Sequence, residues 1–333
     1  MDEREVTEYN DMEDKNCVEE DFDETGSIKE VSDAEKLEDE EVAELIANVM
    51  KLPFDKIKNV NALKKGMTNR SFIFEYENKR YIMRIPGNGS KETVNREEEA
   101  AVYNVINDKD ICDNIIYINP KTGYKITEYI ENARNCDPLN QDDLRKCMNK
   151  LREFHNMKLK VGHTYDLFWY LEYYEKLWKG RSSMYPDYEE TKRKVYELKD
   201  YIDEHAGEMS LTHIDPNYNN FLFSTDENGE EKLNLIDWEY AGMQDTDVDI
   251  AVFGTYAMYD KSQIDNIISL YFPEGCTKER RINIYCYVAI YGLCTSNWCE
   301  YKRHLGIDFG EYSLMQYKYA KEYYDIAKEL MRN

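Results

Sequence analysis

The chain has 333 residues, 42% of them hydrophobic, and a formal net charge of −24 at pH 7. This length favours two compact lobes over one core, because single hydrophobic cores stop growing near ~250–300 residues. No apolar run reaches the ~20 residues of a membrane-spanning helix, and there is no signal-peptide pattern. The eight cysteines form no CxxC pair, which indicates reduced thiols. We therefore expect a cytoplasmic protein, monomeric or homodimeric, with no membrane partner.

The negative charge is concentrated at the N-terminus. Residues 1–44 hold 20 Asp and Glu against four Lys and Arg, which accounts for 16 of the 24 net negative charges. Such a segment cannot bury enough apolar surface to offset the entropy of ordering, so residues 1–40 are expected to be a disordered, solvating tail. The rest of the chain is still acidic, which argues against nucleic acid as a partner. A cationic small molecule would be attracted.

Hydrophobic periodicity predicts a small antiparallel lobe after this tail. Helical spacing of apolar residues predicts helices over 39–52 and 95–108,. β-Rich runs around short polar turns predict strand pairs over 67–87 and 115–130,. These elements make an N-terminal lobe, residues 41–130, of antiparallel strands with one inserted helix. The polar stretch 131–139 is expected to cross to the next lobe.

The C-terminal lobe, residues 131–333, is predicted to be mostly helical. Helical periodicity covers 142–158, 166–178, 188–206 and the chain from about Asp247 onward. A mixed interlude at 211–242 breaks this run. The fold class is therefore α+β, with two lobes.

The interlude contains a polar loop between two apolar runs, "LTHIDPNYNNFLF" (211–223). The apolar segments on either side of the turn "DENG" (226–229) predict a hairpin. This hairpin returns Asp237 to the side of Asn220, with Asp215 on the preceding loop.

That arrangement suits phosphoryl transfer from ATP. Asp215 would orient the attacking hydroxyl and accept its proton, while Asn220 and Asp237 would hold Mg²⁺ against the phosphates. His213, also in the catalytic loop, is best interpreted as the residue that orients it, because Asp215 already fills the role of base. A coincidental polar loop is the alternative, since three fixed positions alone are a weak pattern. The hairpin that follows favours catalysis.

From about Ile46 to Ala327 the sequence resembles the choline/ethanolamine kinase family, particularly bacterial choline kinases. "HIDPNYNN", "LIDWEYAG" and "DVDIAVFG" occur in the family's order and spacing. The resemblance implies a two-lobed protein-kinase-like fold, ATP and Mg²⁺ as cofactors, and phosphorylation of choline to phosphocholine for lipid synthesis or surface-glycan decoration. It also implies that Asp249 supports the catalytic loop. A surface residue at a helix start is the alternative for Asp249.

The resemblance extends to the nucleotide side. "KGMTNRSFIF" (65–74) looks like the family's nucleotide-covering hairpin, in which Gly66 lets the backbone approach phosphate and Thr68 and Asn69 donate to it. An ordinary β-turn is the alternative. Arg84 stands where kinase-like enzymes carry a catalytic strand cation for the phosphates.

The partner of Arg84 is expected on the following helix. Three successive glutamates (97–99) are available there, and helix phase favours Glu99 if Ala100 and Tyr103 are buried. The backbone from about Glu128 to Ile130 resembles the hinge that hydrogen-bonds adenine.

The acceptor site decides the substrate. A quaternary ammonium has no N–H to donate, so aromatic faces and a diffuse negative field recognise it. Glu239 and Tyr240 match the family's acidic and aromatic substrate residues, and Tyr291 and Trp298 are the favoured rings further along. Core packing is the alternative for these rings. The family tends to carry a tryptophan pair near 291–294, where this chain has Tyr291 and Cys294.

Other functions stay open at this point. Ethanolamine, another amino alcohol or an aminoglycoside could replace choline as the acceptor. A pseudokinase-like binding module is the alternative from a different class, although every metal and base position is filled.

Overall fold

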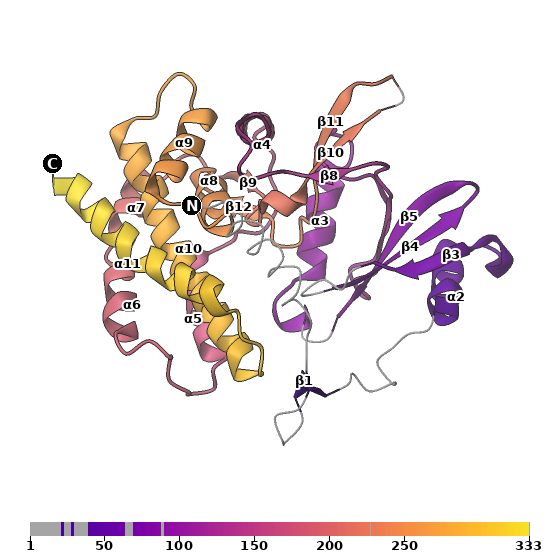
Figure 1. Ribbon diagram of the computed structural model, residues 1–333, viewed down its shortest axis with the longest axis horizontal. Coiled ribbons are helices and arrows are strands. Elements are labelled where there is room, and N and C mark those ends of the chain that lie inside the picture. The colour runs from indigo at the N-terminus through magenta and orange to yellow at the C-terminus, as the bar shows by residue number, and fades with distance from the viewer. Residues whose placement is uncertain are drawn as a thin grey trace. The chain divides into compact units, whose positions relative to one another are not determined.

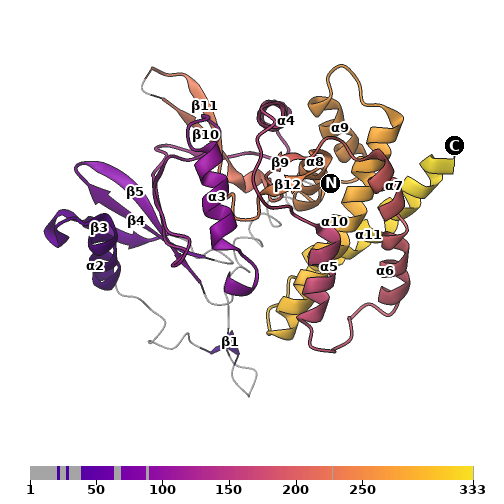
Figure 2. The same ribbon diagram turned by 180° about the vertical axis from the view of Figure 1, so that it is seen from behind.

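A computed structural model describes residues 39–63, 69–87, 90–226 and 228–332. Within the acidic segment 1–40 it describes two short strands, β1 (Asp21–Phe22) and β2 (Ile28–Lys29), which pair antiparallel, and the start of the first helix. The rest of this segment, for which disorder was expected, lies outside the described residues. The chain forms two compact units, residues 1–100 with 114–130 and residues 101–113 with 131–333 (Figures 1 and 2).

The first unit is built on a five-stranded antiparallel sheet. Its strands, in the spatial order β3-β4-β5-β7-β6, are β3 (Lys58–Ala62), β4 (Asn69–Tyr76), β5 (Lys79–Pro86), β7 (Lys125–Glu128) and β6 (Ile115–Ile118). The sequence did not predict β3, because this edge strand is mostly exposed and polar. The β4–β5 hairpin turns at Glu77 and Asn78, whose φ angles of 49° and 64° suit a tight two-residue hairpin loop,.

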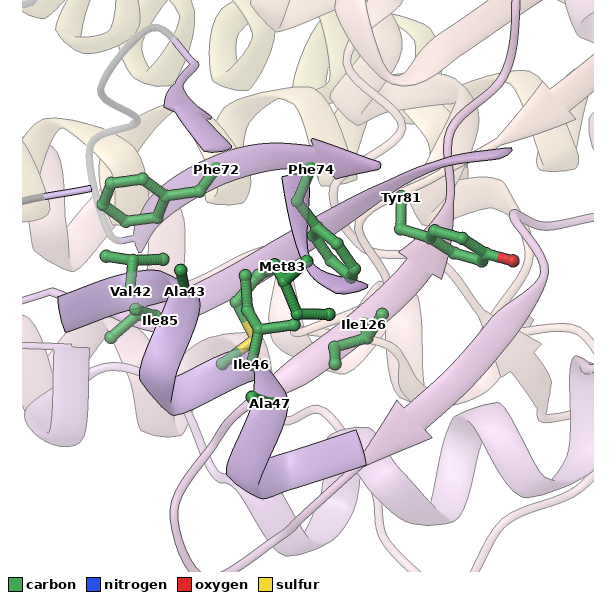
Figure 3. Packing of buried hydrophobic residues seen from close by; sticks show 11 residues of the cluster. Val42, Ala43, Ile46, Ala47, Phe72, Phe74, Tyr81, Met83, Ile85 and Ile126 are labelled. Carbon is green, nitrogen blue, oxygen red and sulfur yellow. The ribbon is translucent and has the colours of Figure 1, made fainter. Parts of the chain in front are cut away.

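One face of this sheet is covered by helix α2 (Asp39–Met50). Val42 and Ile46 from the helix pack against Phe74, Met83 and other apolar side chains of β4, β5 and β7 (Figure 3). Because side chains alternate across a strand, Met83 and Ile126 on this face send Arg84 and Lys125 to the opposite face.

Helix α3 (Arg96–Ile106) follows β5 and the short helix η3 (Ser90–Glu92); η2 (Phe54–Lys56) precedes β3. The boundary between the two units falls inside α3, whereas the sequence placed a single boundary after residue 130. Residues 101–113 group with the second unit because the carbonyl of Ile111 accepts the N–H of Leu235, and that of Cys112 accepts the side-chain N–H of Asn234.

The second unit is mainly helical. Its helices are α4 (Gln141–Asn156), α5 (Leu167–Lys176), α6 (Tyr188–Tyr196), α7 (Lys199–His205), α8 (Asp247–Tyr256), α9 (Lys261–Tyr271), α10 (Lys278–His304) and α11 (Gly310–Arg332). The single helix expected over 188–206 is two, because Glu197 and Leu198 make a tight turn of i→i+3 hydrogen bonds. Helices α10 and α11 approach closely at Gly292, where an added Cβ would lie 2.7 Å from the carbonyl oxygen of Gln316.

Short strands in this unit carry the predicted interlude. They form two sheets, β11-β10-β8 and β12-β9, from β8 (Arg134–Asn135), β9 (Ser210–Thr212), β10 (Phe221–Thr225), β11 (Glu231–Leu235) and β12 (Gly242–Gln244). The antiparallel pairing of Phe221 with Leu235 confirms the predicted hairpin. Strand β8 lies in the stretch expected only as a crossing. No helix of the described residues is long and apolar enough to cross a membrane.

Candidate active site

The loop that the sequence predicts to be catalytic joins β9 to the short helix η4 (Tyr218–Asn220) in a strained conformation. Ile214 has a φ of 69°, which is unfavourable for a β-branched residue,. Asp249 on α8 stabilises this backbone: its Oδ2 accepts the N–H of His213 and its Oδ1 that of Ile214, both at 2.8 Å. His155 holds Asp249 in turn through Nε2, at 2.9 Å. Asp249 is fully buried, so the interpretation of it as a surface residue is wrong and its supporting role is confirmed.

His213 is a buried part of the loop. Its Nε2 lies 2.9 Å from the carbonyl oxygen of Ile236, and its Nδ1 accepts the N–H of Asp215 at 3.2 Å. Burial lowers the pKa of His213 to about 4, against the opposing charge of Asp249. The imidazole is therefore neutral near pH 7, and both nitrogens are engaged in fixing the loop.

Asp215 presents a carboxylate with one unengaged oxygen. Its Oδ2 accepts a long hydrogen bond from Asn220 Nδ2, at 3.4 Å, whereas Oδ1 is buried and bonds to none of the described residues. Burial raises the pKa of Asp215 well above its usual range. Asp237 and Glu239 raise it further, while the nearby Tyr256 hydroxyl and Asn220 oppose them. An oxygen of this kind suits a hydroxyl donor, and an adjacent cation would return the carboxyl to its ionised form.

Asn220 and Asp237 lie at the same end of the β10–β11 hairpin. The N–H of Ile236 donates to the carbonyl oxygen of Asn220 at 2.9 Å, which brings the two residues together. Asn220 Nδ2 donates to the backbone oxygen of Asp215 at 2.9 Å, so the amide orientation is fixed. Asp237 has a φ of 65°.

The donor chemistry at this point fits Mg²⁺. Side-chain oxygens of one amide and one carboxylate are hard ligands, and Mg²⁺ is commonly held by one or two protein groups with phosphate and water filling the rest. Among the described residues no group of three His, Cys, Asp or Glu side chains could hold a metal, which does not bear on a site built partly from Asn220.

Arg84 and Glu99 form a buried ion pair in the first unit. Arg84 Nη2 lies 2.5 Å from Glu99 Oε1. Of the three candidate glutamates, the structure thus pairs Arg84 with the one that helix phase favoured. Arg96 Nη1 also donates to Glu99, at 2.8 Å, and its Nη2 donates to Asn69 Oδ1 at 2.7 Å. Asn69 therefore stands beside this cluster, at the start of β4. Gly66 and Thr68, proposed to contact phosphate, lie outside the described residues.

The predicted adenine hinge follows β7. The N–H of Glu128 donates to the carbonyl oxygen of Asn114 and the N–H of Tyr129 to that of Arg80, each at 3.0 Å. Two of the hinge amides are therefore already used within the first unit.

Aromatic rings gather near Asp215 in the second unit. Burial raises the pKa of Tyr256 and of Tyr291 well above the ordinary value, and the nearby Asp215 carboxylate raises both further. The ring of Tyr256 lies 6.1 Å from that of Tyr291 and 6.3 Å from that of Tyr312, between centroids. Tyr291 thus lies near Asp215, and its contact with the substrate stays a prediction.

Other predicted acceptor residues lie around this group. Glu239 is buried, and its charge adds to the effect of burial in raising the pKa of Asp215. Tyr240 likewise adds to the effect of burial in raising the pKa of Tyr174 on α5. The ring centroid of Trp298 lies 4.9 Å from that of Phe309, and the centroid of Phe309 lies 6.4 Å from that of Tyr312.

Sequence reasoning missed Tyr256 and Tyr312. Tyr256 falls seven residues after Asp249 on α8, so the two share a helix face, and this spacing was the available signal. Nothing local marked Tyr312, which lies near the start of α11.

These features define a kinase-like phosphotransferase. Its antiparallel lobe carries a buried cation, Arg84, on a strand. Its helical lobe carries Asp215 and Asn220 on one loop and Asp237 at the end of the following hairpin. Residues 60–288 match the family model described as "Choline/ethanolamine kinase". The chain belongs to the choline/ethanolamine kinase family.

Individual relatives agree with this assignment. Protein LicA of Haemophilus influenzae is 24% identical over 264 residues, which cover 75% of this chain and 75% of that protein. The crystal structure of choline kinase LicA from Streptococcus pneumoniae superimposes with a TM-score of 0.72 at 24% identity, over 86% of this chain and 98% of that one. A structure of LicA in complex with AMP gives 0.71 at 25% identity, over 86% and 97% of the chains.

Proposed function

We propose that this enzyme transfers the γ-phosphoryl group of ATP to the hydroxyl of choline, which yields phosphocholine and ADP. The observation that carries the proposal is the group of tyrosine rings beside Asp215. Tyr256 and Tyr291 both lie close enough to that carboxylate for its charge to raise their pKa. The same part of the unit therefore offers a base for a hydroxyl and aromatic faces for an ammonium group.

The chemistry follows from Asp215. Its buried Oδ1 would accept the hydrogen bond of the substrate hydroxyl and then its proton, as the hydroxyl oxygen forms a bond to the γ-phosphorus,. The bond from that phosphorus to the β–γ bridging oxygen breaks and ADP leaves. Asp249 keeps the loop in place, and neutral His213 fixes the backbone of Asp215 without taking part in proton transfer.

Asn220 and Asp237 are the proposed Mg²⁺ ligands. When bound there, the ion would supply positive charge that offsets the negative charge developing on the transferred phosphoryl group. Burial raises the pKa of Asp215 and the neighbouring Asp237 carboxylate raises it further, and a nearby cation would oppose both effects.

On the nucleotide side, Arg84, oriented by Glu99, would contact the phosphates together with Asn69, Gly66 and Thr68. Because the amides of Glu128 and Tyr129 are used within the unit, adenine would pair with the carbonyl oxygen of Glu128 and the N–H of Ile130.

Choline is favoured over an aminoglycoside because aromatic rings gather near Asp215. Quaternary ammonium groups bind to the negative faces of aromatic rings. Glu239 and Asp215 supply the negative field, and Tyr240, Tyr291, Tyr312 and Trp298 are the candidate rings.

Ethanolamine is the second candidate. Burial raises the pKa of Tyr165 and of Tyr174, and the nearby Tyr170 and Tyr291 raise both further. Phenolic oxygens gathered in this way can accept N–H bonds that a primary ammonium offers and choline lacks.

The experiment is a comparison of kcat/KM for choline, ethanolamine and an aminoglycoside with Mg-ATP, with the product identified by mass spectrometry. We expect choline to have the highest value. A higher value for ethanolamine would transfer the assignment to the second candidate, and no turnover of either amine would overturn the proposal.

The seven cysteines of the described residues are free thiols, which supports the cytoplasm as the compartment.

A further inference from the structure

Two cations stand opposite each other on neighbouring strands of the first unit. Arg84 on β5 is the direct antiparallel partner of Lys125 on β7, and both side chains are buried, with 7% and 6% of their surface exposed. Like charges directly opposite in a sheet repel each other, and burial strengthens the repulsion because water no longer screens it. A cross-strand pair of this kind requires an anion.

Glu99 is one such anion. Its carboxylate contacts Arg84 at 2.5 Å and Arg96 at 2.8 Å, and lies 3.4 Å from Lys125 Nζ. The neighbouring cations overcome the effect of burial and lower the pKa of Glu99 to about 2, so it is ionised at any physiological pH. One carboxylate thus serves three cations, and these four side chains sum to a charge of +2.

The three contacts are unequal. Arg84 reaches both oxygens of Glu99 through Nη2 alone, so this ion pair does not engage Nη1 or Nε. The separation between Lys125 and Glu99 is the longest of the three, beyond the usual 2.7–2.9 Å of a charge-assisted hydrogen bond. Lys125 is therefore held less tightly by Glu99 than the two arginines are, on the face of the sheet that also carries Arg84.

We propose that Lys125 is a second phosphate-binding cation, which acts beside Arg84 on the polyphosphate of the nucleotide. The proposal rests on the proposed function only in assuming that this unit binds a nucleoside triphosphate. Arg84 supplies a planar fork and Lys125 a compact point charge, and register alone puts them side by side. Arg96 anchors Glu99 to Asn69, so the carboxylate keeps its place when either cation contacts phosphate.

The test is calorimetric titration of ATP, ADP, AMP and adenosine into the whole protein and its Lys125→Met variant. If Lys125 contacts the phosphates, its removal must weaken binding most for the ligand that carries the most phosphates. We expect the affinity for ATP to fall about tenfold, the loss to shrink through ADP and AMP, and the affinity for adenosine to be unchanged. In steady-state assays KM for ATP should rise and KM for choline should not.

Two variants are the controls. Lys125→Arg keeps the charge and should restore most of the affinity for ATP. Lys79→Met removes an exposed lysine from β5 of the same sheet and should change none of the four affinities.

Equal losses for all four ligands, or no loss for any, would overturn the proposal. If Lys125→Met does not fold, Lys125→Gln keeps a donor for Glu99 and carries the same test. Failure of both to fold, with Lys125→Arg folded, would assign Lys125 to structural support of Glu99. Because nucleotide binding is measured directly, the result does not depend on whether choline is the acceptor.

Discussion

Asp249 holds the N–H of Ile214 at 2.8 Å, and Ile214 has a backbone φ of 69°. The strained residue, Ile214, thus directly precedes the proposed base, Asp215. The buried carboxylate of Asp249 on helix α8 fixes the backbone of Ile214. Strain of this kind persists only where the surrounding structure determines it. The position of Asp215 therefore depends on Asp249, a fully buried residue of helix α8.

Asp249→Asn tests this dependence. An amide can accept only through one oxygen, so one of the two backbone N–H groups would lose its acceptor. We expect the free energy of unfolding to fall by about 2–4 kcal/mol and kcat to fall, with KM for ATP unchanged. Denaturant unfolding and steady-state kinetics measure both. The matched control is Asp325→Asn on the exposed face of α11, which should stay within about 0.5 kcal/mol of the wild type. Wild-type kcat in Asp249→Asn would contradict the argument.

Asp215→Asn separates catalysis from folding. Loss of the base should lower kcat by a factor of about 10²–10⁴. Because burial, Asp237 and Glu239 all raise the pKa of Asp215, its charged form destabilises the protein without ligands. A neutral amide should leave the melting temperature at or above that of the wild type. Near-full activity, or a clearly lower melting temperature, would count against the assignment.

Asp237→Asn tests the proposed metal ligand. Replacing a carboxylate by an amide weakens Mg²⁺ binding, so the Mg²⁺ concentration for half-maximal rate should rise about tenfold or more. Rates measured against free Mg²⁺ at saturating ATP give this value. Asp226→Asn, in the exposed turn of the same hairpin, is the control and should leave the Mg²⁺ dependence unchanged. An unchanged requirement in Asp237→Asn would exclude it as a ligand.

A buried acid at the start of α8 predicts a pH dependence of stability. Burial and, after it, the charge of Asp245 raise the pKa of Asp247 to about 7 against the opposing effects of Arg280 and Asn283. An acid whose pKa is raised by folding binds more protons in the folded state, so its stabilising contribution is complete below pH ~4 and is lost as the pH rises through about 7,.

Asp247→Asn should remove this slope. Its stability relative to the wild type is expected to increase between pH 5 and 8, by an amount on the order of a few kcal/mol. Chemical unfolding of both proteins at several pH values measures the difference. A difference that is constant over this range would show that Asp247 has an ordinary pKa.

Tyr312 tests the proposed ammonium site. Tyr312→Leu keeps apolar volume but removes the ring face, and cation–π contacts contribute about 0.5–2 kcal/mol. KM for choline should therefore rise roughly 2–30-fold, with KM for ATP unchanged. Tyr312→Phe keeps the ring and should behave as the wild type. If Leu and Phe give the same KM for choline, the ring does not contact the ammonium group.

The catalytic loop and its hairpin were predictable because their signals are local. Turn residues at 226–229 between two apolar runs determine the β10–β11 hairpin, and the hairpin determines that Asp237 returns to Asn220. The helix phase of α3 likewise favoured Glu99. Edge strand β3 escaped prediction, since its polar, exposed sequence carries no alternating pattern.

The sequence by itself determined the two-lobed α+β fold and the residues able to act as base, metal ligands and strand cation. Only the tertiary structure decided which rings gather near Asp215 and which cation stands opposite Arg84. Tyr256 and Tyr312 come from different helices, and the pairing of Lys125 with Arg84 follows from the register of two strands separated by α3. Local propensity reflects near neighbours in the chain, whereas helix packing and strand register depend on long-range contacts that no short motif encodes.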